Sequence, residues 1–466
     1  MLDQVSKPSG AGGPPATAPS SPLTYSDLLA HFQRGCKPVA DRRIGLEHEK
    51  IGVVLGKEGR ARPLPYAAGP DEPQIRQLFA GLQNHGWEPS SDGGIDGAVV
   101  ALRRKRASVT LEPGGQFELS GAPLTTDVEA VRELDEHLSE LLPLAEQAGI
   151  TFIGCGFRPL GTWSDVPWVP KGRYAIMREY LPTRGTLGVE MMKRTATVQA
   201  NLDYTSEADA MDKLRLSLRL GPLVTAMFAA SPLRDGTPCG YKSFRAACWL
   251  DTDPDRCGAL PFLFRQDAGF ASYVDWALDV PLFFVYRHKR YIPAGGMTFR
   301  TFMRDGFQGE VATLADWELH LSTLFPDTRL KQYIEVRTAD AGPLSTVRCL
   351  ASLWRGWLYC DQAQQAATAL LSDVTVEELL ALRAAVPQQG LHAPLHGKPI
   401  QSLCLELVDI ARHGLVQIAD AESVALLDPL RAYVAAGRCP ADDILDAFHA
   451  AAGDESRFIR AVQLRL

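Results

Sequence analysis

The segment of residues 43–53, RIGLEHEKIGV, constrains the fold more than any other part of the chain. It places Glu47 and Glu49 two residues apart within a largely apolar run. Side chains alternate between the two faces of a β-strand, so this spacing predicts that both carboxylates project from one face. Two like charges on a half-buried face repel each other and lose hydration, so a cation must compensate them. A hard divalent metal ion is the natural candidate.

Three later segments repeat this pattern of oxygen-bearing side chains at a spacing of two on an apolar background. They are Glu112, Gln116 and Glu118 in residues 109–123, Gln199, Asn201 and Asp203 in residues 195–204, and Glu335 beside Arg337 in residues 333–340. One such segment alone is more simply an amphipathic strand with one wet face. Because four segments share this pattern, we expect them to form one sheet, with one face that holds several magnesium ions. His48 would point to the opposite face, into the core.

Arginines in apolar or glycine-rich surroundings indicate anionic substrates. Planar guanidinium groups bind carboxylates and phosphates through two hydrogen bonds. Each arginine taken alone is equally consistent with a surface charge or a structural ion pair. The candidates are Arg178 in residues 170–182, Arg245 in residues 241–258, and Arg300 in residues 295–303.

Carboxylates for magnesium, arginines for anions and the lack of an obvious covalent nucleophile together indicate phosphoryl transfer from ATP. In such reactions catalysis is mostly positioning and charge neutralisation. The sequence contains no P-loop, kinase-type glycine loop, G-x-S-x-G elbow or HExxH helix. The nucleotide must therefore be held in another way.

Six segments carry a family resemblance: RIGLEHEKIGV, LEPGGQFELSGAP, PKGRYAIMREYLP, GVEMMKRTATVQANLDY, GGMTFRTFM and YIEVRTADAGP. They lie in order over residues 43–357, and together they resemble the plant and proteobacterial type of glutamate–cysteine ligase. The resemblance implies an α+β fold shared with glutamine synthetase and the guanidino kinases. In that fold a curved antiparallel β-sheet forms a substrate funnel and helices cover its outer face. The implied cofactors are ATP and Mg²⁺. The implied reaction phosphorylates the side chain of L-glutamate and lets the amine of L-cysteine displace the phosphate.

The resemblance also implies roles for single residues. The magnesium ligands would be Glu47, Glu49, Glu112, Glu118, Gln199 and Glu335. The residues that bind glutamate carboxylates or the transferring phosphoryl group would be Arg178, Arg245 and Arg300, with Tyr241 as a further substrate contact and Arg178 and Arg300 as the catalytic pair. The contacts to ATP phosphates would be Arg194 and Arg337.

The cysteines depart from the plant pattern, in which two disulfides control activity. Ala294 stands before the GGMTFRTFM segment, and residues 304–316 contain no cysteine. Cys349 matches one half of the other bridge, but the helix expected near Val131 offers no partner. Nine cysteines with scattered spacing are best interpreted as reduced thiols. Redox switching of the plant kind is therefore not expected.

Composition and charge set the wider expectations. A net charge of −7 disfavours nucleic-acid binding, and no run reaches the roughly 18 apolar residues of a membrane span. Residues 1–22 lack the features of a signal or transit peptide and are predicted to be a disordered tail. We therefore expect a cytoplasmic monomer or homodimer acting on small molecules, with one catalytic domain over residues 23–466.

Helices are predicted mainly in the last part of the chain, about residues 344–466. The predicted helical segments are residues 126–149, 206–230, 344–369, 375–386, 399–414, 424–435 and 442–451. Two other functions fit the residues. Because no residue can be assigned to a cysteine pocket, the chain could be a γ-glutamyl ligase that uses a different amine. It could also be a non-catalytic sensor of nucleotide or amino acid.

Overall fold

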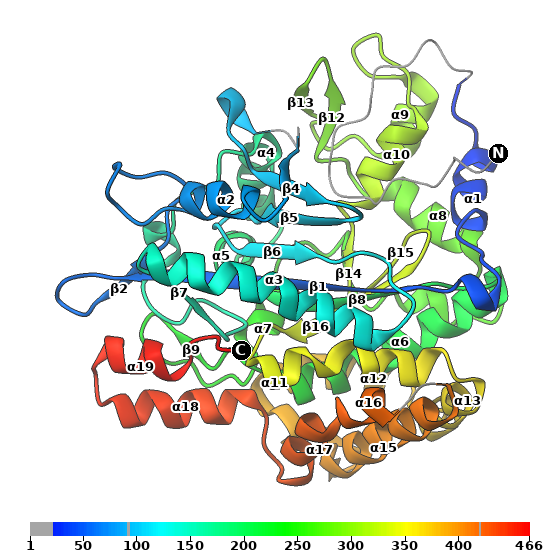
Figure 1. The fold of residues 1–466 in the computed structure, drawn as a ribbon. Coiled ribbons are helices and arrows are strands. Elements are labelled where there is room, and N and C mark those ends of the chain that lie inside the picture. Colours follow the sequence, from blue (N-terminus) through cyan, green and yellow to red (C-terminus); the bar gives the residue numbers. More distant parts are fainter. Residues whose placement is uncertain (1–21, 91–93, 419–420) are drawn as a thin grey trace.

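The computed structural model describes residues 22–90, 94–418 and 421–466, so the predicted tail lies almost entirely outside the described residues. A ten-stranded sheet crosses the molecule in the order β15-β16-β8-β1-β6-β5-β4-β3, and β2 and β7 pair with β1 outside this path (Figure 1). Its strands are β1 Ile44–Leu55, β2 Ala61–Pro63, β3 Glu88–Pro89, β4 Ala101–Arg104, β5 Ala107–Leu111, β6 Phe117–Ser120, β7 Ile150–Ile153, β8 Thr197–Leu202, β15 Thr328–Leu330 and β16 Ile334–Asp340. Every pairing in this sheet is antiparallel, as predicted.

Strand β1 organises the sheet because it has several partners along its length. Its first half pairs with β6 and β8, and its second half pairs with β2 and β7. Leu46 and His48 are buried, as the alternation within this strand predicts. The helix α3 (Asp127–Gln147), capped by Thr126, packs against β1 and β7. One face of the sheet therefore belongs to the core.

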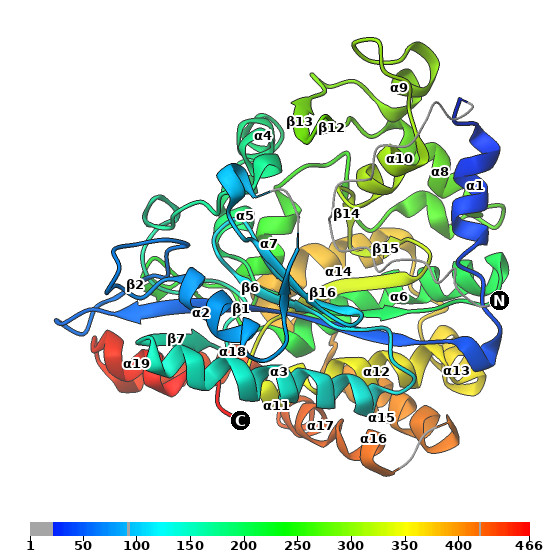
Figure 2. The ribbon, with the colours of Figure 1, turned by 45° about the horizontal axis from the view of Figure 1, so that its top comes forward.

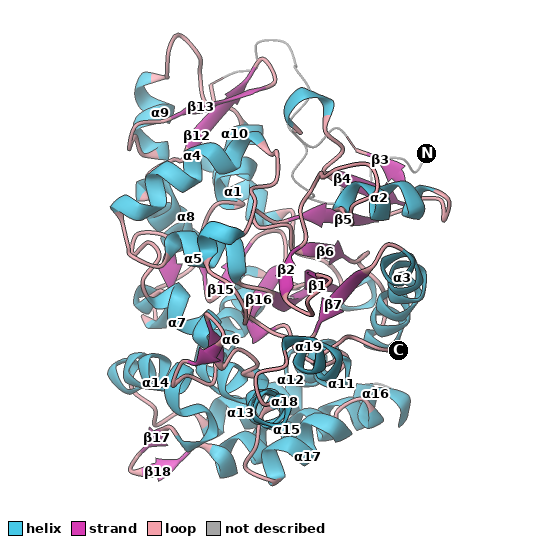
Figure 3. Ribbon diagram, turned by 90° about the vertical axis from the view of Figure 1, so that its left-hand side faces the viewer, coloured by secondary structure: helices cyan, strands magenta, loops and turns pink. Residues whose placement is uncertain are grey.

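Helices cover this core face in layers (Figure 2). Together with α3, the helices α6 (Glu207–Phe228) and α12 (Cys349–Leu358) pack against the strands, α6 on β16 and α12 on β8. The helix α15 (Gln401–Ile418) then packs on α12. Figure 3 shows α6, α12 and α15 below the sheet and α3 beside it, with the hairpin β12–β13 and helix α9 above the sheet.

The last quarter of the chain, from residue 344 on, is mostly helical, as predicted. Its elements are α11 Leu344–Val347, α12, α13 Asp361–Leu370, α14 Val376–Gln389, α15, α16 Ala421–Ala425, α17 Asp428–Ala435, α18 Pro440–Ala451 and α19 Glu455–Ala461, with the short strands β17 Pro394–Leu395 and β18 Lys398–Pro399. The stretch expected as one helix over residues 344–369 is divided into three. Tyr359 ends α12, and its hydroxyl donates to the carbonyl of Arg43 (2.5 Å) and accepts from the amide of Asp203 (2.6 Å), which ties the helix end to the start of β1.

The remaining elements lie mainly around the other face and the rim of the sheet. They are α1 Tyr25–Gln33, α2 Ile75–Gln83, α4 Gly172–Tyr180, α5 Gly188–Arg194, α7 Phe244–Leu250, α8 Phe270–Asp279, α9 Phe299–Asp305, α10 Leu314–Leu321, β9 Leu233–Arg234, β10 Thr237–Pro238, β11 Cys257–Gly258, β12 Phe284–Arg287, β13 Arg290–Pro293 and β14 Phe325–Pro326. Among the helices of the described residues, none combines the length and the apolar character needed to cross a membrane.

Candidate active site

Strand register brings the predicted carboxylates onto one face of the sheet. Glu47 of β1 lies directly opposite Gln199 of β8, and Glu49 lies directly opposite Glu118 of β6. Residues that face each other in an antiparallel pair project to the same side. The same rule places Glu335 of β16 on this side, since it lies opposite Asn201. We call this surface the acidic face; its residues are Glu47, Glu49, Glu112, Glu118, Gln199, Asn201 and Glu335.

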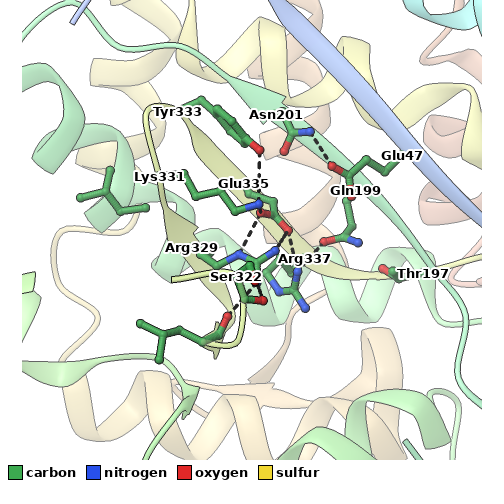
Figure 4. Close-up of polar contacts among 12 residues, drawn as sticks. Glu47, Thr197, Gln199, Asn201, Ser322, Arg329, Lys331, Tyr333, Glu335 and Arg337 are labelled. Carbon is green, nitrogen blue, oxygen red and sulfur yellow. Dashed lines mark hydrogen bonds and ion pairs between the residues drawn. The ribbon is translucent and has the colours of Figure 1, made fainter. Parts of the chain in front are cut away.

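Each carboxylate in the middle of the acidic face accepts a hydrogen bond from a neutral donor. Glu47 accepts from the Asn201 amide (2.8 Å, Figure 4), Glu49 from the backbone N–H of Thr197 (3.0 Å), and Glu118 from the Thr110 hydroxyl (2.5 Å). Within the described part of the chain, none of the three forms an ion pair with lysine or arginine. Nearby cations still act on these groups: Lys331 lowers the pKa of Glu47, Arg245 that of Glu49, and Lys171 and Lys50 that of Glu118.

Burial and mutual repulsion outweigh these cations and raise the pKa of the three carboxyl groups. Burial raises the pKa of Glu47 to about 7, with a further contribution from Glu335 and Glu118. Burial, then Glu112 and Glu118, raises the pKa of Glu49 well above its usual value. Burial and Glu112 also raise the pKa of Glu118. Hard oxygen donors that repel one another match the chemistry of a divalent cation such as Mg²⁺.

The carboxylates of the acidic face are not arranged as a preformed metal site. Within the ranges that the structure describes, no group of three or more His, Cys, Asp or Glu side chains is arranged closely enough to hold a metal ion. The donors share a face but do not converge on one point. The observation that favours a bound cation is therefore the mutual repulsion of these carboxylates and not a preformed set of metal ligands.

The raised pKa of Glu47 predicts how stability depends on pH in the metal-free protein. The folded state holds the proton more tightly than the unfolded chain, whose glutamate pKa is about 4.3. This contribution is complete below about pH 4.3 and is lost as the pH rises through the folded pKa of about 7. We expect the melting temperature in EDTA to fall from pH 5 to pH 8, and to fall less in Glu47→Gln. Parallel profiles for the two proteins would contradict this.

Glu335 has different surroundings from the other acidic residues (Figure 4). Its Oε1 accepts from Arg329 (2.6 Å) and Arg337 (2.6 Å), and its Oε2 accepts from Arg329 (2.9 Å) and forms an ion pair with Lys331 (3.0 Å). Although burial opposes it, these three cations hold the pKa of Glu335 well below its usual value. A carboxylate offers about four lone-pair positions, and all are used. The structure therefore does not support the expected role of Glu335 as a metal ligand; the residue holds a cluster of cations.

Two of the predicted arginines border the acidic face. Arg337 donates to Gln199 (2.8 Å) as well as to Glu335. Arg245 is buried, donates to the backbone carbonyl of Arg337 (2.8 Å), and its charge opposes the rise in the pKa of Glu49. Both arginines line one pocket together with Trp249. Their positions are compatible with binding an anion near the carboxylates.

Arg194 is not placed to contact a phosphate, contrary to the expectation. Its side chain is fully buried. One terminal nitrogen donates to Glu190 (3.1 Å) and Asp235 (2.6 Å), and the other donates to the carbonyls of Arg158 (2.9 Å) and Gly161 (2.8 Å). Its terminal donors are therefore engaged within the protein, and the residue is structural.

Arg300 is not placed at the acidic face either. It lies on α9, which Figure 1 shows far from the sheet, and its side chain is 45% exposed. It forms a bidentate pair with Asp279 (2.7 and 2.9 Å) and a longer contact with Asp275 (3.4 Å). This surface ion pair gives no support to a catalytic role.

The two other substrate candidates lie outside the acidic face. The ring of half-buried Tyr241 packs edge-on against Phe244, as part of the core packing. Arg178 is exposed on α4, where its guanidinium group lies 5.7 Å from the ring centre of Trp168. The structure adds Arg329 and Lys331 to the site and places Asn201, already singled out by its strand pattern, beside Glu47. Arg329 lies on β15 and Lys331 in the turn after it, two residues apart, so the alternation that identified Glu47 was also a signal for them.

A single antiparallel sheet that gathers carboxylates and arginines on one face is compatible with an enzyme that binds cations and anionic substrates. Residues 43–461 match the family model described as Glutamate-cysteine ligase family 2 (GCS2). The chain belongs to this family of ATP-dependent ligases.

Similar proteins agree with this assignment. The chain is 43% identical to "Glutamate--cysteine ligase B, chloroplastic" of Oryza sativa subsp. japonica, over 94% of this chain and 87% of the relative. It is 42% identical to the chloroplastic glutamate–cysteine ligase of Arabidopsis thaliana, over 94% of this chain and 83% of the relative. The fold is similar to a crystal structure of glutamate–cysteine ligase from Francisella tularensis in complex with AMP. That match has a TM-score of 0.57 at 13% identity, and it covers 92% of this chain and 88% of that one.

These relatives correct one expectation. The sequence predicted a cytoplasmic protein, but the curated relatives named here are chloroplastic enzymes. The comparison therefore contradicts the cytoplasmic prediction.

Proposed function

We propose that the chain joins the γ-carboxylate of L-glutamate to the amine of L-cysteine at the acidic face, giving γ-glutamylcysteine for glutathione-type thiol synthesis. ATP would first phosphorylate the glutamate side chain. The cysteine amine would then attack the acyl carbon, lose a proton and displace phosphate. The observation that carries this proposal is the group of mutually repelling carboxylates with raised pKa values beside Arg245 and Arg337, in a chain of this family.

In this proposal the acidic face holds Mg²⁺ and its border holds the anions. The residues that would bind the ion are Glu47, Glu49, Glu112, Glu118 and Gln199. When bound, Mg²⁺ supplies positive charge that offsets the charge on the phosphates. Arg337 is held between Gln199 and Glu335, so its guanidinium group is oriented before a substrate arrives. Arg245 donates a hydrogen bond to the backbone carbonyl of Arg337 and adds positive charge.

A coupled assay for ADP tests the function. Purified full-length protein should release ADP only when ATP, Mg²⁺, L-glutamate and L-cysteine are all present, and γ-glutamylcysteine should appear in equal amount. ADP release with another amine but not with cysteine would change the acceptor. No release with any amine would contradict the ligase proposal. Size-exclusion chromatography would test the further proposal of a monomer or homodimer with a single catalytic domain over residues 23–466.

A further inference from the structure

One carboxylate of the acidic face is not held by the strand register. Glu47, Glu49 and Glu118 lie within paired strands, whereas β5 ends at Leu111, so Glu112 lies in the turn that leads to β6. Glu112 is nevertheless close enough to Glu49 and Glu118 for its charge to raise the pKa of both. The place of Glu112 on the acidic face therefore depends on what fixes this turn.

Backbone hydrogen bonds set the shape of the turn. The amide of Glu112 donates to the carbonyl of Gln116 (3.0 Å), and the amide of Gly115 donates to the carbonyl of Glu112 (2.9 Å). Gly115 has a φ of +82°, in the left-handed region that favours glycine. The amide of Val169 donates to the carbonyl of Pro113 (3.0 Å), which is one link from the turn to the rest of the protein. The side chain of Gln116 provides another.

The side chain of Gln116 joins the turn to the end of helix α5. It is 3% exposed, and both ends of its amide are engaged. Its Oε1 accepts from the amide of Gly114 (2.9 Å), and its Nε2 donates to the carbonyls of Met192 (3.2 Å) and Thr195 (2.7 Å). Because a carbonyl can only accept and an N–H can only donate, these partners fix the orientation of the amide. Gln116 is therefore a bridge between two segments that are distant in the sequence.

The carbonyls that Gln116 reaches lie where a helix leaves its last carbonyls without intrahelical donors. The amide of Ala196, four residues after Met192, donates to the carbonyl of Gly156 (2.9 Å) and not back to the helix. Without Gln116 the carbonyl of buried Met192 would lose its side-chain donor, which is costly inside a protein. The bridge thus satisfies polar groups at the helix end as well as in the turn.

Two further contacts connect this helix end to the acidic face. A Cβ atom at Gly114 would clash with the carbonyl of Lys193, so the close approach of the turn to α5 requires glycine. Directly after the helix end, β8 begins with Thr197, whose amide donates to Glu49 (3.0 Å). The segment that receives Gln116 therefore leads into the strand that supports Glu49.

We propose that Gln116 is a positioning residue of the metal site: its side-chain amide holds the turn against the end of α5 and so places Glu112 beside Glu49 and Glu118. This inference rests on the proposed function, in which these carboxylates bind Mg²⁺. Gln116 acts through Glu112 and is not itself a metal ligand. Replacing a residue that orients a metal ligand typically weakens metal binding by about 10- to 100-fold.

Metal binding measured without turnover tests the inference. Electron paramagnetic resonance, which detects free Mn²⁺, gives the affinity of the full-length protein for this analogue of Mg²⁺. Gln116→Met keeps the size of the side chain but loses its three hydrogen bonds, and we expect it to bind Mn²⁺ about 10- to 100-fold more weakly than wild type. Gln83→Met, which removes an exposed glutamine at the end of α2, is the matched control and should bind like wild type.

A double-mutant cycle separates positioning from a general structural role. In the Glu112→Gln background, Gln116→Met should weaken Mn²⁺ binding by less than about 2-fold, because the carboxylate through which Gln116 acts is already gone. Equal losses in the two backgrounds would overturn the inference. Wild-type affinity in Gln116→Met would overturn it as well.

The result is separable from the outcome of the ligase assay. An inactive wild type whose Mn²⁺ binding follows the expected pattern would overturn only the proposed function, whereas a wild type that binds no Mn²⁺ would overturn the inference. Gln116→Glu keeps an acceptor for the amide of Gly114 but loses both donors, so it carries the same comparison if Gln116→Met does not fold. If neither variant folds, the amide stabilises the whole protein, and a role confined to the metal site is overturned.

Discussion

Changing Glu47 or Glu49 to glutamine is expected to lower magnesium-dependent turnover by on the order of 100-fold or more, with no loss of folded protein. Each change removes a charged oxygen donor from the acidic face but keeps the shape of the side chain. It also removes a repulsive charge, because burial and neighbouring carboxylates raise the pKa of both groups. We therefore expect the melting temperature in EDTA to stay the same or to rise at pH 8.

Steady-state kinetics over a range of Mg²⁺ concentrations, together with thermal unfolding, would measure both effects. Glu58→Gln is the matched control, because Glu58 is an exposed glutamate in the turn after β1. It should keep wild-type turnover. Wild-type turnover in both Glu47→Gln and Glu49→Gln would remove these residues from the metal site. A marked drop in melting temperature would show that their charges stabilise the fold.

The same change at Glu335 is expected to act in the opposite direction on stability. Glu335→Gln should lower the free energy of unfolding by about 3–5 kcal/mol, because it leaves buried Arg329 and its neighbours Lys331 and Arg337 without their shared counter-ion. The lowered pKa of Glu335 means that its contribution is present above the unfolded pKa of about 4.3 and is lost as the pH falls below it. Turnover should also fall, because Arg337 loses one of the two groups that orient it.

Chemical denaturation at pH 7 of wild type, Glu335→Gln and Glu47→Gln would compare the two sites directly. Opposite signs for the two variants are expected. Equal and small effects would mean that the cations around Glu335 are compensated in another way. A more stable Glu335→Gln would place this residue with the repelling carboxylates, as first expected from its position in the strand.

The positions of Glu47 and Glu49 show which features of the site a local sequence pattern can predict. A strand has a period of two, so the face of each carboxylate follows from its position alone. The capped helices α3 and α14 follow from local signals as well: Thr126 and Thr375 each begin a helix at the expected residue. By contrast, the pattern alone could not tell a glutamate that meets other carboxylates from one that meets arginines.

Arg194 and Arg300 show what such a pattern leaves open. Both stand in segments that resemble the family, yet one is buried among Glu190, Asp235 and backbone carbonyls, and the other pairs with Asp279 at the surface. An arginine's role depends on which acceptors lie within about 3 Å, and those acceptors come from distant parts of the chain.

By itself, the sequence determined the face of each strand on which the carboxylates lie and the long capped helices, because these depend on periods and caps within a few residues. The antiparallel sheet was expected from the family resemblance. Tertiary structure decided the charge state of each group. The strand order β16-β8-β1-β6 brings Glu47, Glu49 and Glu118 together without a direct ion pair to a cation of the described residues, whereas the turn between β15 and β16 folds Arg329 and Lys331 back onto Glu335. Electrostatic energy depends on distance and burial rather than on position in the chain, so only the folded arrangement separates repelling carboxylates from a neutralised one.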